Sequence, residues 1–323
     1  MTASSTRRPV SGRSRTAAAG AATAVVAALL LSGCGDQTDA AIAAREAAKT
    51  RDVHAPLFKK LPKAVQDKGF LQVGSDATYK PVEFRKNGAI VGIDPDLAAA
   101  MSKQLGVKLN FNNATFDTLM GGLKSKRYDL AMSAMTDTKE RQQGIDSTTG
   151  KKIGEGVDFV DYFNAGVSLY VQKGKSSTVS DWADLCGKSI AVQRGTVSHD
   201  YAKDQSAKCK KGGEEAISIE AFDNDSEAQT RLRTGGVDAV SSDYPVAAYA
   251  VKTSGGGKDF EVVGDQVEAA PYGIAVPKSQ PQLRDALKAA LEATIKNGDY
   301  AKVLKKWQVK DAGVKEVKLN GGS

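Results

Sequence analysis

Short apolar runs alternate with segments of helical periodicity from about residue 66 to residue 308. The run Phe70–Gly74 is apolar and ends in glycine, which indicates a strand, whereas residues 94–105 carry apolar side chains at helical spacing before Gly106. The two patterns then recur. We expect further strands at 107–111, 129–132, 189–192, 237–240 and 272–276, and helices at 116–123, 197–201, 243–251, 282–296 and 300–307. This alternation predicts an α/β fold with mostly parallel sheets.

The first 33 residues have the organisation of an export signal. Four arginines precede an Ala-rich apolar run at about residues 17–31, and the run ends in Leu31-Ser32-Gly33-Cys34. A basic start, a short apolar stretch and small residues predict a secretory signal peptide, and the run is too short for a stable spanning helix. The Leu-Ser-Gly-Cys end resembles the bacterial lipobox. We therefore expect residues 1–33 to be removed and Cys34 to become the lipidated N-terminus of a protein held on the outer face of the cell membrane.

Two alternatives remain for this region. The cysteine could follow an ordinary signal peptide by chance, and the Arg7-Arg8 pair could direct twin-arginine export. Apolar residues are missing directly after that pair, so we favour the general export route. Residues 34–65 are Ala-rich and charged, and we interpret them as the lipid anchor and a tether.

Charge and cysteine content limit the classes of function that the sequence allows. The 45 Lys and Arg outnumber 38 Asp and Glu, but removal of the four signal arginines leaves 41 and a net charge of about +3. That charge is too small and too dispersed to indicate nucleic-acid binding. Cys186 and Cys209 lie in an exported chain, so a disulfide between them is expected rather than a metal or catalytic thiol. His54 and His199 have no ligand-spaced neighbours, so we assign no metal and no cofactor.

Polar clusters follow four of the predicted strands. They are Asp76 to Tyr79, Ser133 with Thr136, Gly195 with Thr196, and Asp243, and Arg141 lies just after the second of them. Ligands of open α/β sheets bind beyond the carboxyl ends of the strands. A free amino acid suits such a set. Its carboxylate would pair with a guanidinium and with amides at a helix start, and its ammonium would pair with a carboxylate.

The same residues carry a resemblance to a known family. Gly74–Pro81, Val91–Leu97, Asp129–Thr136 with Lys139-Glu140-Arg141, Ala191–Thr196 and Val237–Pro245 occur in the order found in the polar amino-acid solute-binding proteins of bacterial ABC transporters. The resemblance covers about residues 66–308. It implies a two-lobed, class II periplasmic-binding-protein-like fold with a ligand cleft between the lobes and two hinge strands. Lobe 1 would comprise residues 66–165 and, after the chain returns to it, residues 266–323 with the C-terminal tail. Lobe 2 would comprise residues 166–265.

The resemblance also implies roles for single residues. Arg141 matches the arginine that clamps the ligand carboxylate, and Asp243 matches the aspartate that receives the α-ammonium. Other matched positions surround these two: the strand-end residues Ser133, Ala134 and Thr136, the second-lobe turn Thr196 and Val197, the aromatic walls Tyr79 and Phe116, and the side-chain positions Asp76, Glu83, Gln193 and Ser242. Ala134 stands where the family often has Ser or Gly, so only its backbone could serve. The segment 147–157 is an apparent insertion before the hinge.

The implied function is capture of a polar L-amino acid by hinge closure and delivery to a membrane permease, without catalysis, by a protein that we expect to be a monomer. Asp76 and Glu83 would favour a basic ligand, whereas Gln193 and Ser242 would suit glutamine equally well. Two other functions stay open. One is a cyclohexadienyl-dehydratase-like enzyme with Glu83 or Asp76 as its acid or base. The other is a receptor that presents its closed form to a sensor.

Overall fold

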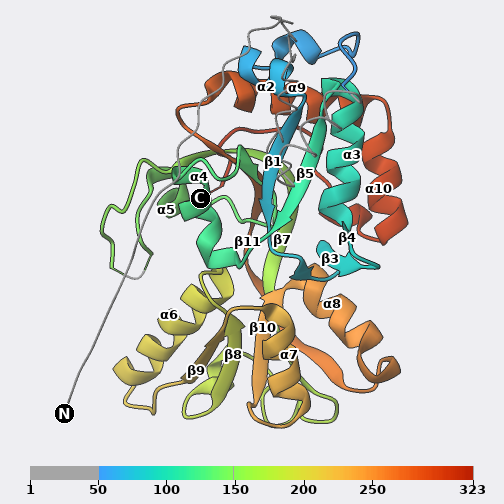
Figure 1. Cartoon of the computed structure of the whole chain (residues 1–323). Helices are drawn as coiled ribbons and strands as arrows, with labels where there is room; N and C mark the ends of the chain where they lie inside the picture. The colour runs from blue at the N-terminus through green and yellow to red at the C-terminus, as the bar shows by residue number, and fades with distance from the viewer. Residues whose placement is uncertain (1–50, 148, 323) are drawn as a thin grey trace, which may run out of the picture.

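The computed structural model describes residues 51–147 and 149–322 as two α/β lobes, one above the other (Figure 1). The predicted signal peptide, the lipidated Cys34 and the tether up to residue 50 lie outside the described residues. One eight-stranded sheet runs through both lobes in the order β5-β1-β6-β11-β7-β10-β8-β9, and β2-β3-β4 form a small second sheet. Within the described residues, no helix is long and apolar enough to cross a membrane.

Lobe 1 is built around parallel strands with helices on both faces of the sheet. Its strands are β1 (Phe70–Ser75), β5 (Lys108–Asn113) and β6 (Leu130–Ala131), with β2 (Thr78–Tyr79), β3 (Glu83–Lys86) and β4 (Ala89–Val91) beside them. Its helices are α2 (Lys63–Lys68), α3 (Ile93–Leu105), α4 (Leu119–Lys124), α5 (Lys139–Gln143), α9 (Pro281–Lys296) and α10 (Asp299–Trp307). Single 3-10 turns lie at Phe58–Lys60, Phe116–Thr118 and Lys310–Ala312.

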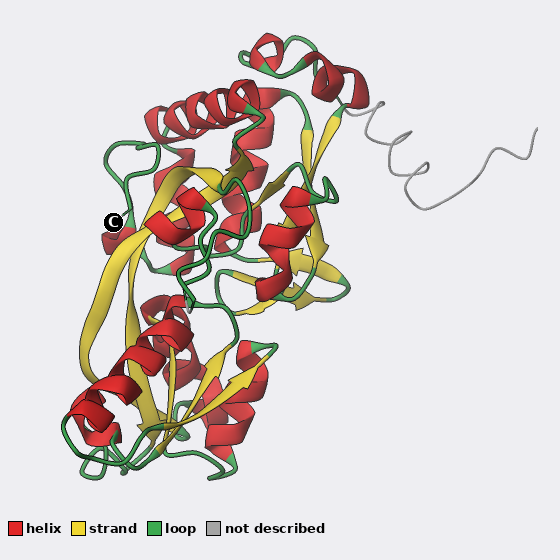
Figure 2. Ribbon diagram, turned by 90° about the vertical axis from the view of Figure 1, so that its left-hand side faces the viewer, coloured by secondary structure: helices red, strands yellow, loops and turns green. Residues whose placement is uncertain are grey.

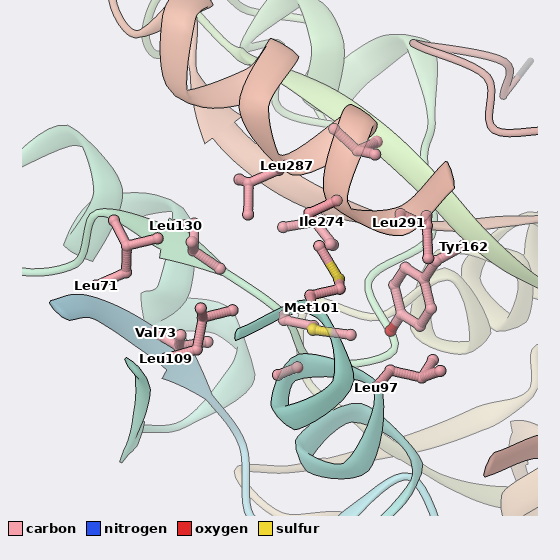
Figure 3. Close-up of a cluster of buried hydrophobic side chains, with 14 of the residues drawn as sticks. Leu71, Val73, Leu97, Met101, Leu109, Leu130, Tyr162, Ile274, Leu287 and Leu291 are labelled. Atoms are coloured by element: carbon pink, nitrogen blue, oxygen red, sulfur yellow. The ribbon is translucent and has the colours of Figure 1, made fainter. Parts of the chain in front are cut away.

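The core of lobe 1 follows from the apolar faces of these elements. Met101 of α3, Leu287 of α9 and Val73 of β1 meet between the helices and the sheet (Figure 3). Each of these side chains is fully buried. A second cluster, which includes Leu119 of α4 and Tyr128, covers the opposite face of the sheet. The strand ends are therefore held in fixed positions from both sides.

Lobe 2 repeats the arrangement on a smaller scale. Strands β8 (Ser189–Gln193), β9 (Ser218–Phe222) and β10 (Ala239–Asp243) are parallel, with β8 in the centre. They are joined by helices α6 (Val197–Lys211), α7 (Asp225–Arg233) and α8 (Tyr244–Thr253), and 3-10 turns lie at Trp182–Leu185 and Ser254–Gly256. The predicted disulfide between Cys186 and Cys209 is present and ties the segment before β8 to the end of α6.

Two long antiparallel strands, β7 (Val157–Gln172) and β11 (Phe260–Pro277), connect the lobes (Figure 2). Phe163 of β7 packs in the core of lobe 1, and Val167 packs in the core of lobe 2. The pairing of β11 with β7 is irregular between Val263 and Ala270. The sheet is mixed rather than mostly parallel because these crossing strands run against their neighbours. A break in the ladder at the crossing allows bending there with little loss of hydrogen bonding.

The tether prediction was wrong for residues 51–65. Ala55, Phe58, Leu61 and Val65 are buried in the lobe 1 core, where Leu57 N–H also donates to the Gln104 carbonyl at 2.9 Å. Their spacing of three to four residues places one apolar face on α3 and α9. Residues 55–65 therefore belong to the folded lobe 1.

Candidate functional site

A cavity of about 280 Å³ lies between the lobes at the carboxyl ends of the strands. It is lined by Asp76, Tyr79, Glu83, Phe116, Ala134, Thr136, Arg141, Gln193, Thr196, Val197 and Asp243. The residues come from both lobes, so the cavity exists only while the lobes are closed on each other.

Arg141 is the cation of this cavity. It lies on α5, whose first turn is capped by Thr138, with the Arg141 N–H donating to the threonine Oγ1 at 3.3 Å. One guanidinium nitrogen donates to the Thr136 carbonyl at 2.7 Å, and another donates to the Gly195 carbonyl of lobe 2 at 3.0 Å. The guanidinium also lies over the Phe116 ring, 5.3 Å from its centre. Burial lowers the pKa of Arg141, yet a guanidinium stays charged at neutral pH and has five N–H donors, so donors remain for a carboxylate.

The second lobe presents a helix start to the same region. Thr196 is the N-cap of α6: its Oγ1 accepts from the His199 N–H at 3.3 Å and donates to the Gln193 carbonyl at 2.8 Å. The first backbone N–H groups of a helix have no partners within the helix and attract anions. Gly195 precedes the cap with φ +75°, and a Cβ there would lie 3.1 Å from the Cβ of Asp117 in lobe 1. The glycine permits the close approach of the two lobes.

Asp243, at the end of β10, is the buried anion beside the aromatic residues. Its carboxylate accepts from the Tyr272 hydroxyl at 2.8 Å, and its N–H donates to the Tyr79 hydroxyl of lobe 1 at 2.9 Å. Burial raises the pKa of Asp243 to about 6, although the hydrogen bonds from the two tyrosines and the charge of Arg141 oppose the rise. The group is therefore an anion at neutral pH and is held in one orientation.

Two further carboxyl groups, Asp76 and Glu83, line the cavity. Asp76 accepts hydrogen bonds from the Thr78 hydroxyl at 2.7 Å, the Phe116 N–H at 3.1 Å and, across the cleft, the Gln193 amide at 2.6 Å. Glu83 is fully buried and accepts from the Ser133 hydroxyl at 3.0 Å. Burial raises the pKa of both groups. Arg141 is the sole cation among the described lining residues, so this part of the cavity favours a positively charged guest.

Most of the predicted site residues meet at the cavity. Ser133 lies behind the lining instead, where its hydroxyl accepts from the Asp76 N–H at 2.8 Å and donates to Glu83. Ser242 lies below the lining as well and donates to the buried Asp225. The Ala134 N–H is bonded to Asp94 at 3.2 Å, in a left-handed turn of φ +46°, so that N–H is not free for a ligand.

Three buried groups behind the lining were missed by the sequence interpretation. Tyr272 orients Asp243, Asp225 accepts from Ser242, and Asp94 accepts from Ala134 N–H and from the Tyr162 hydroxyl. Asp94 and Tyr272 lie in segments that the sequence singled out, the Gly92-Ile93-Asp94 motif and a predicted strand start. A polar residue next to an apolar run was the only signal.

The insertion at 147–157 forms a loop at the rim of the cleft, while Val157 already begins β7. Its base is closed by a bridge between Ile145 and Lys152, and Ser147 donates from the loop to Asp200 of α6 at 2.6 Å. The loop therefore adds a contact between the lobes outside the cavity.

Comparisons with known proteins agree with this architecture. The family model described as bacterial extracellular solute-binding proteins, family 3, matches residues 71–310. The arginine-binding protein ArgT of Corynebacterium glutamicum is 32% identical over 80% of this chain and 81% of its own. The histidine-binding periplasmic protein of Salmonella typhimurium is 29% identical over 73% of this chain and 86% of its own.

Solved structures show the same likeness. An ancestral arginine-binding protein bound to arginine has 37% identity and a TM-score of 0.65, over 74% of this chain and 98% of its own. An ancestral protein described as a precursor of cyclohexadienyl dehydratase, itself an amino acid-binding protein, has 35% identity and a TM-score of 0.65, over 76% and 97%. With the two lobes, the crossing strands and the cavity between them, this chain belongs to the bacterial extracellular solute-binding proteins, family 3.

Proposed function

We propose that this protein captures a basic L-amino acid, arginine foremost, between its lobes and delivers it to the permease of an ABC importer. The observation that carries the choice of ligand is the pair of buried carboxyl groups, Asp76 and Glu83, in a cavity whose own cation, Arg141, lies against Phe116 and two carbonyls. A guanidinium or ammonium can pair with Asp76 and with an ionised Glu83, whereas a neutral amide brings no counter-charge for either group.

The remaining lining residues would hold the part common to all amino acids. Arg141 and the start of α6 at Thr196 and Val197 would bind the α-carboxylate, and Asp243 would bind the α-ammonium. Thr136 also lines the cavity, with its carbonyl accepting from Arg141, and Tyr79 and Phe116 would cover the aliphatic part of the side chain. The known ligands of the relatives support this assignment, since several of those named are arginine-binding proteins.

Capture would proceed by closure of the lobes about β7 and β11. Hydrogen bonds span the cleft in the closed form, among them those from Gln193 to Asp76, from Arg141 to Gly195 and from Asp243 to Tyr79. A ligand that contacts both lobes adds interactions that only the closed form offers and shifts the population toward it. A basic side chain would replace the Gln193 amide as the partner of Asp76, or share the carboxylate with it.

Export and anchoring complete the proposal. Lipidation at Cys34 and the segment up to about residue 50 would hold the monomer at the outer face of the membrane, within reach of its permease. Transport rather than sensing is supported by the ABC transporter relatives. The absence of bond chemistry is supported by relatives that are named as binding proteins.

Calorimetry of the mature domain with arginine, lysine, histidine and glutamine tests the ligand class. We expect the basic amino acids to bind more tightly than glutamine, and Asp76→Asn to weaken arginine by about tenfold or more while glutamine changes little. Asp67→Asn, on α2 and paired with Lys63 on the surface, is the matched control. Preference for glutamine over every basic amino acid would refute the assignment. Release of labelled product from a prephenate-like substrate would refute the non-enzymatic role.

A further inference from the structure

Glu83 and Asp94 form a pair of carboxyl groups behind and beside the cavity. Glu83 lies on β3 and lines the cavity, and Asp94 lies in the first turn of α3; both side chains are fully buried. The Asp94 N–H donates to the carbonyl of Val82, the residue before Glu83, at 3.1 Å, so the two carboxyl groups lie close together, and the negative charge of Asp94 helps to raise the pKa of Glu83. Glu83 Oε1 accepts from Ser133, and Asp94 Oδ2 accepts from the Tyr162 hydroxyl at 2.8 Å. The pair therefore links the cavity lining to the helix behind it.

The remaining oxygens of the pair have no other partner. Glu83 Oε2 and Asp94 Oδ1 are buried, and neither has a hydrogen bond to any other described residue. Two ionised carboxylates in contact, without water or a cation, would repel each other strongly. A proton on one of the two carboxyl groups removes the repulsion and supplies the hydrogen-bond donor that the unpaired oxygens lack. The burial and the unpaired oxygens therefore favour one proton on the pair in the ligand-free protein.

The surroundings place the charge on Asp94 and the proton on Glu83. Asp94 accepts from Tyr162 and from the Ala134 N–H, and it lies at the positive end of α3. Glu83 has the Ser133 hydroxyl alone. Burial raises the pKa of Asp94 to about 7 and raises the pKa of Glu83 further, with the negative charge of Asp94 adding to the rise.

The other charged groups around the pair do not neutralise it. Asp76, after β1, faces Glu83 and adds negative charge, and Tyr162 of β7 is neutral because burial raises its pKa well above the usual range. Asp96, on the same turn of α3, is engaged outside by Lys306 and Trp307. Arg141 donates to the Thr136 and Gly195 carbonyls. Within residues 51–147 and 149–322 no cation pairs with Glu83, so we look to the ligand for a cation beside it.

We propose that the Glu83–Asp94 pair reports the charge of the ligand side chain: it holds one proton when no cation is present and releases that proton when a guanidinium or ammonium enters beside Glu83. The O–H bond of Glu83 breaks, the proton passes to solvent, and the charge of the ligand takes its place. Asp94 is thereby a positioning residue that selects for basic ligands without touching them. This inference rests on the proposed function.

Proton release links affinity to pH in a defined direction. The free protein binds one proton more than its complex with a basic ligand, so the affinity for arginine rises with pH by up to about tenfold per pH unit over the neutral range. Citrulline has the shape of arginine without the side-chain charge and leaves the proton on Glu83. Any proton change at Asp243, which meets the α-ammonium of both ligands, cancels in the comparison.

The test is calorimetry at pH 7.5 in buffers of different ionisation enthalpy, with arginine and citrulline as ligands. The dependence of the heat on the buffer gives the number of protons released. We expect arginine to release between about half and one proton more than citrulline. Asp94→Asn removes the neighbouring charge that keeps Glu83 protonated. Arginine should then release no more protons than citrulline, and its affinity should no longer rise steeply with pH. Asp96→Asn, on the same turn and outside the cavity, should keep both.

The outcomes separate the two proposals. Equal proton release by two ligands that both bind overturns the role of the pair and leaves the proposed function intact. Failure of arginine to bind at any pH overturns the proposed function instead. If Asp94→Asn does not fold, as judged by circular dichroism, Glu83→Gln provides the second variant. It should bind citrulline with no excess release by arginine, and persistence of the excess in that variant would overturn the inference.

Discussion

Replacement of Arg141 by Met removes the cation of the cavity and keeps an apolar stem against Phe116. In the complex, a ligand carboxylate would face the guanidinium in a closed, water-poor space. Loss of one partner from a buried charged pair costs about 3–5 kcal/mol, largely because the other charge is left uncompensated. At 1.4 kcal/mol for each factor of ten, the dissociation constant should rise between about a hundredfold and a few thousandfold.

The fold should tolerate the same change. The guanidinium donates to two carbonyls, of Thr136 and Gly195, and loss of these bonds is partly offset because a buried charge is also removed. We expect the free energy of unfolding to fall by less than about 2 kcal/mol. Urea unfolding in the absence of ligand measures this change in the free energy of unfolding separately from the change in binding.

Two matched variants make the assay specific. Arg141→Lys keeps the charge but not the planar fork of donors, so its loss of affinity should lie between those of wild type and Arg141→Met. Arg85→Met, at an exposed position of β3, should leave binding unchanged. A loss of less than about tenfold for Arg141→Met, in a protein that is folded by circular dichroism, would refute the carboxylate role.

Three further predictions follow from other parts of the molecule. Gly195→Ala should weaken ligand binding by about tenfold in calorimetry, because its Cβ would press on Asp117 in the closed form. Gly174 has a similar φ of +83° and open space around it, so Gly174→Ala should leave binding unchanged and add only the backbone strain of about 1 kcal/mol that both variants share. The disulfide between Cys186 and Cys209, at a sequence separation of 23, restricts the unfolded chain. Replacement of both cysteines by Ser should therefore lower the free energy of unfolding by about 3 kcal/mol, and an unchanged denaturant midpoint would contradict this reasoning. Burial raises the pKa of Asp243 to about 6, so its ionisation destabilises the folded state relative to the unfolded chain. The ligand-free protein should therefore gain stability as the pH falls from 7 to 5, and Asp243→Asn should reduce that gain in thermal melts.

Much of the fold could be predicted because the apolar patterns are local. Helix α3 has apolar residues at helical spacing and ends at Gly106, whose φ of +70° suits a left-handed cap, and the sequence marks both features. The crossing strands were harder. Of β7 and β11, only residues 272–276 were expected as a strand. Each of these strands passes from the core of one lobe to the core of the other, so different faces of it are buried along its length. Residues 51–65 were misjudged because their four buried apolar residues are spread over eleven positions among charged residues.

The site likewise has a part that could be predicted from the sequence and a part that could not. Lining residues such as Asp76 and Thr196 follow strands directly, and the topology brings the strand ends together, so their meeting could be predicted. Asp94 and Tyr272 act through other residues, and their positions depend on how α3 and β11 pack, which no spacing along the chain specifies. A carboxylate near a helix start is usually solvated, yet at Asp94 it is buried against Glu83. The groups behind the lining set its protonation, so the charge that the cavity presents to a ligand depends on residues that the sequence pattern leaves out.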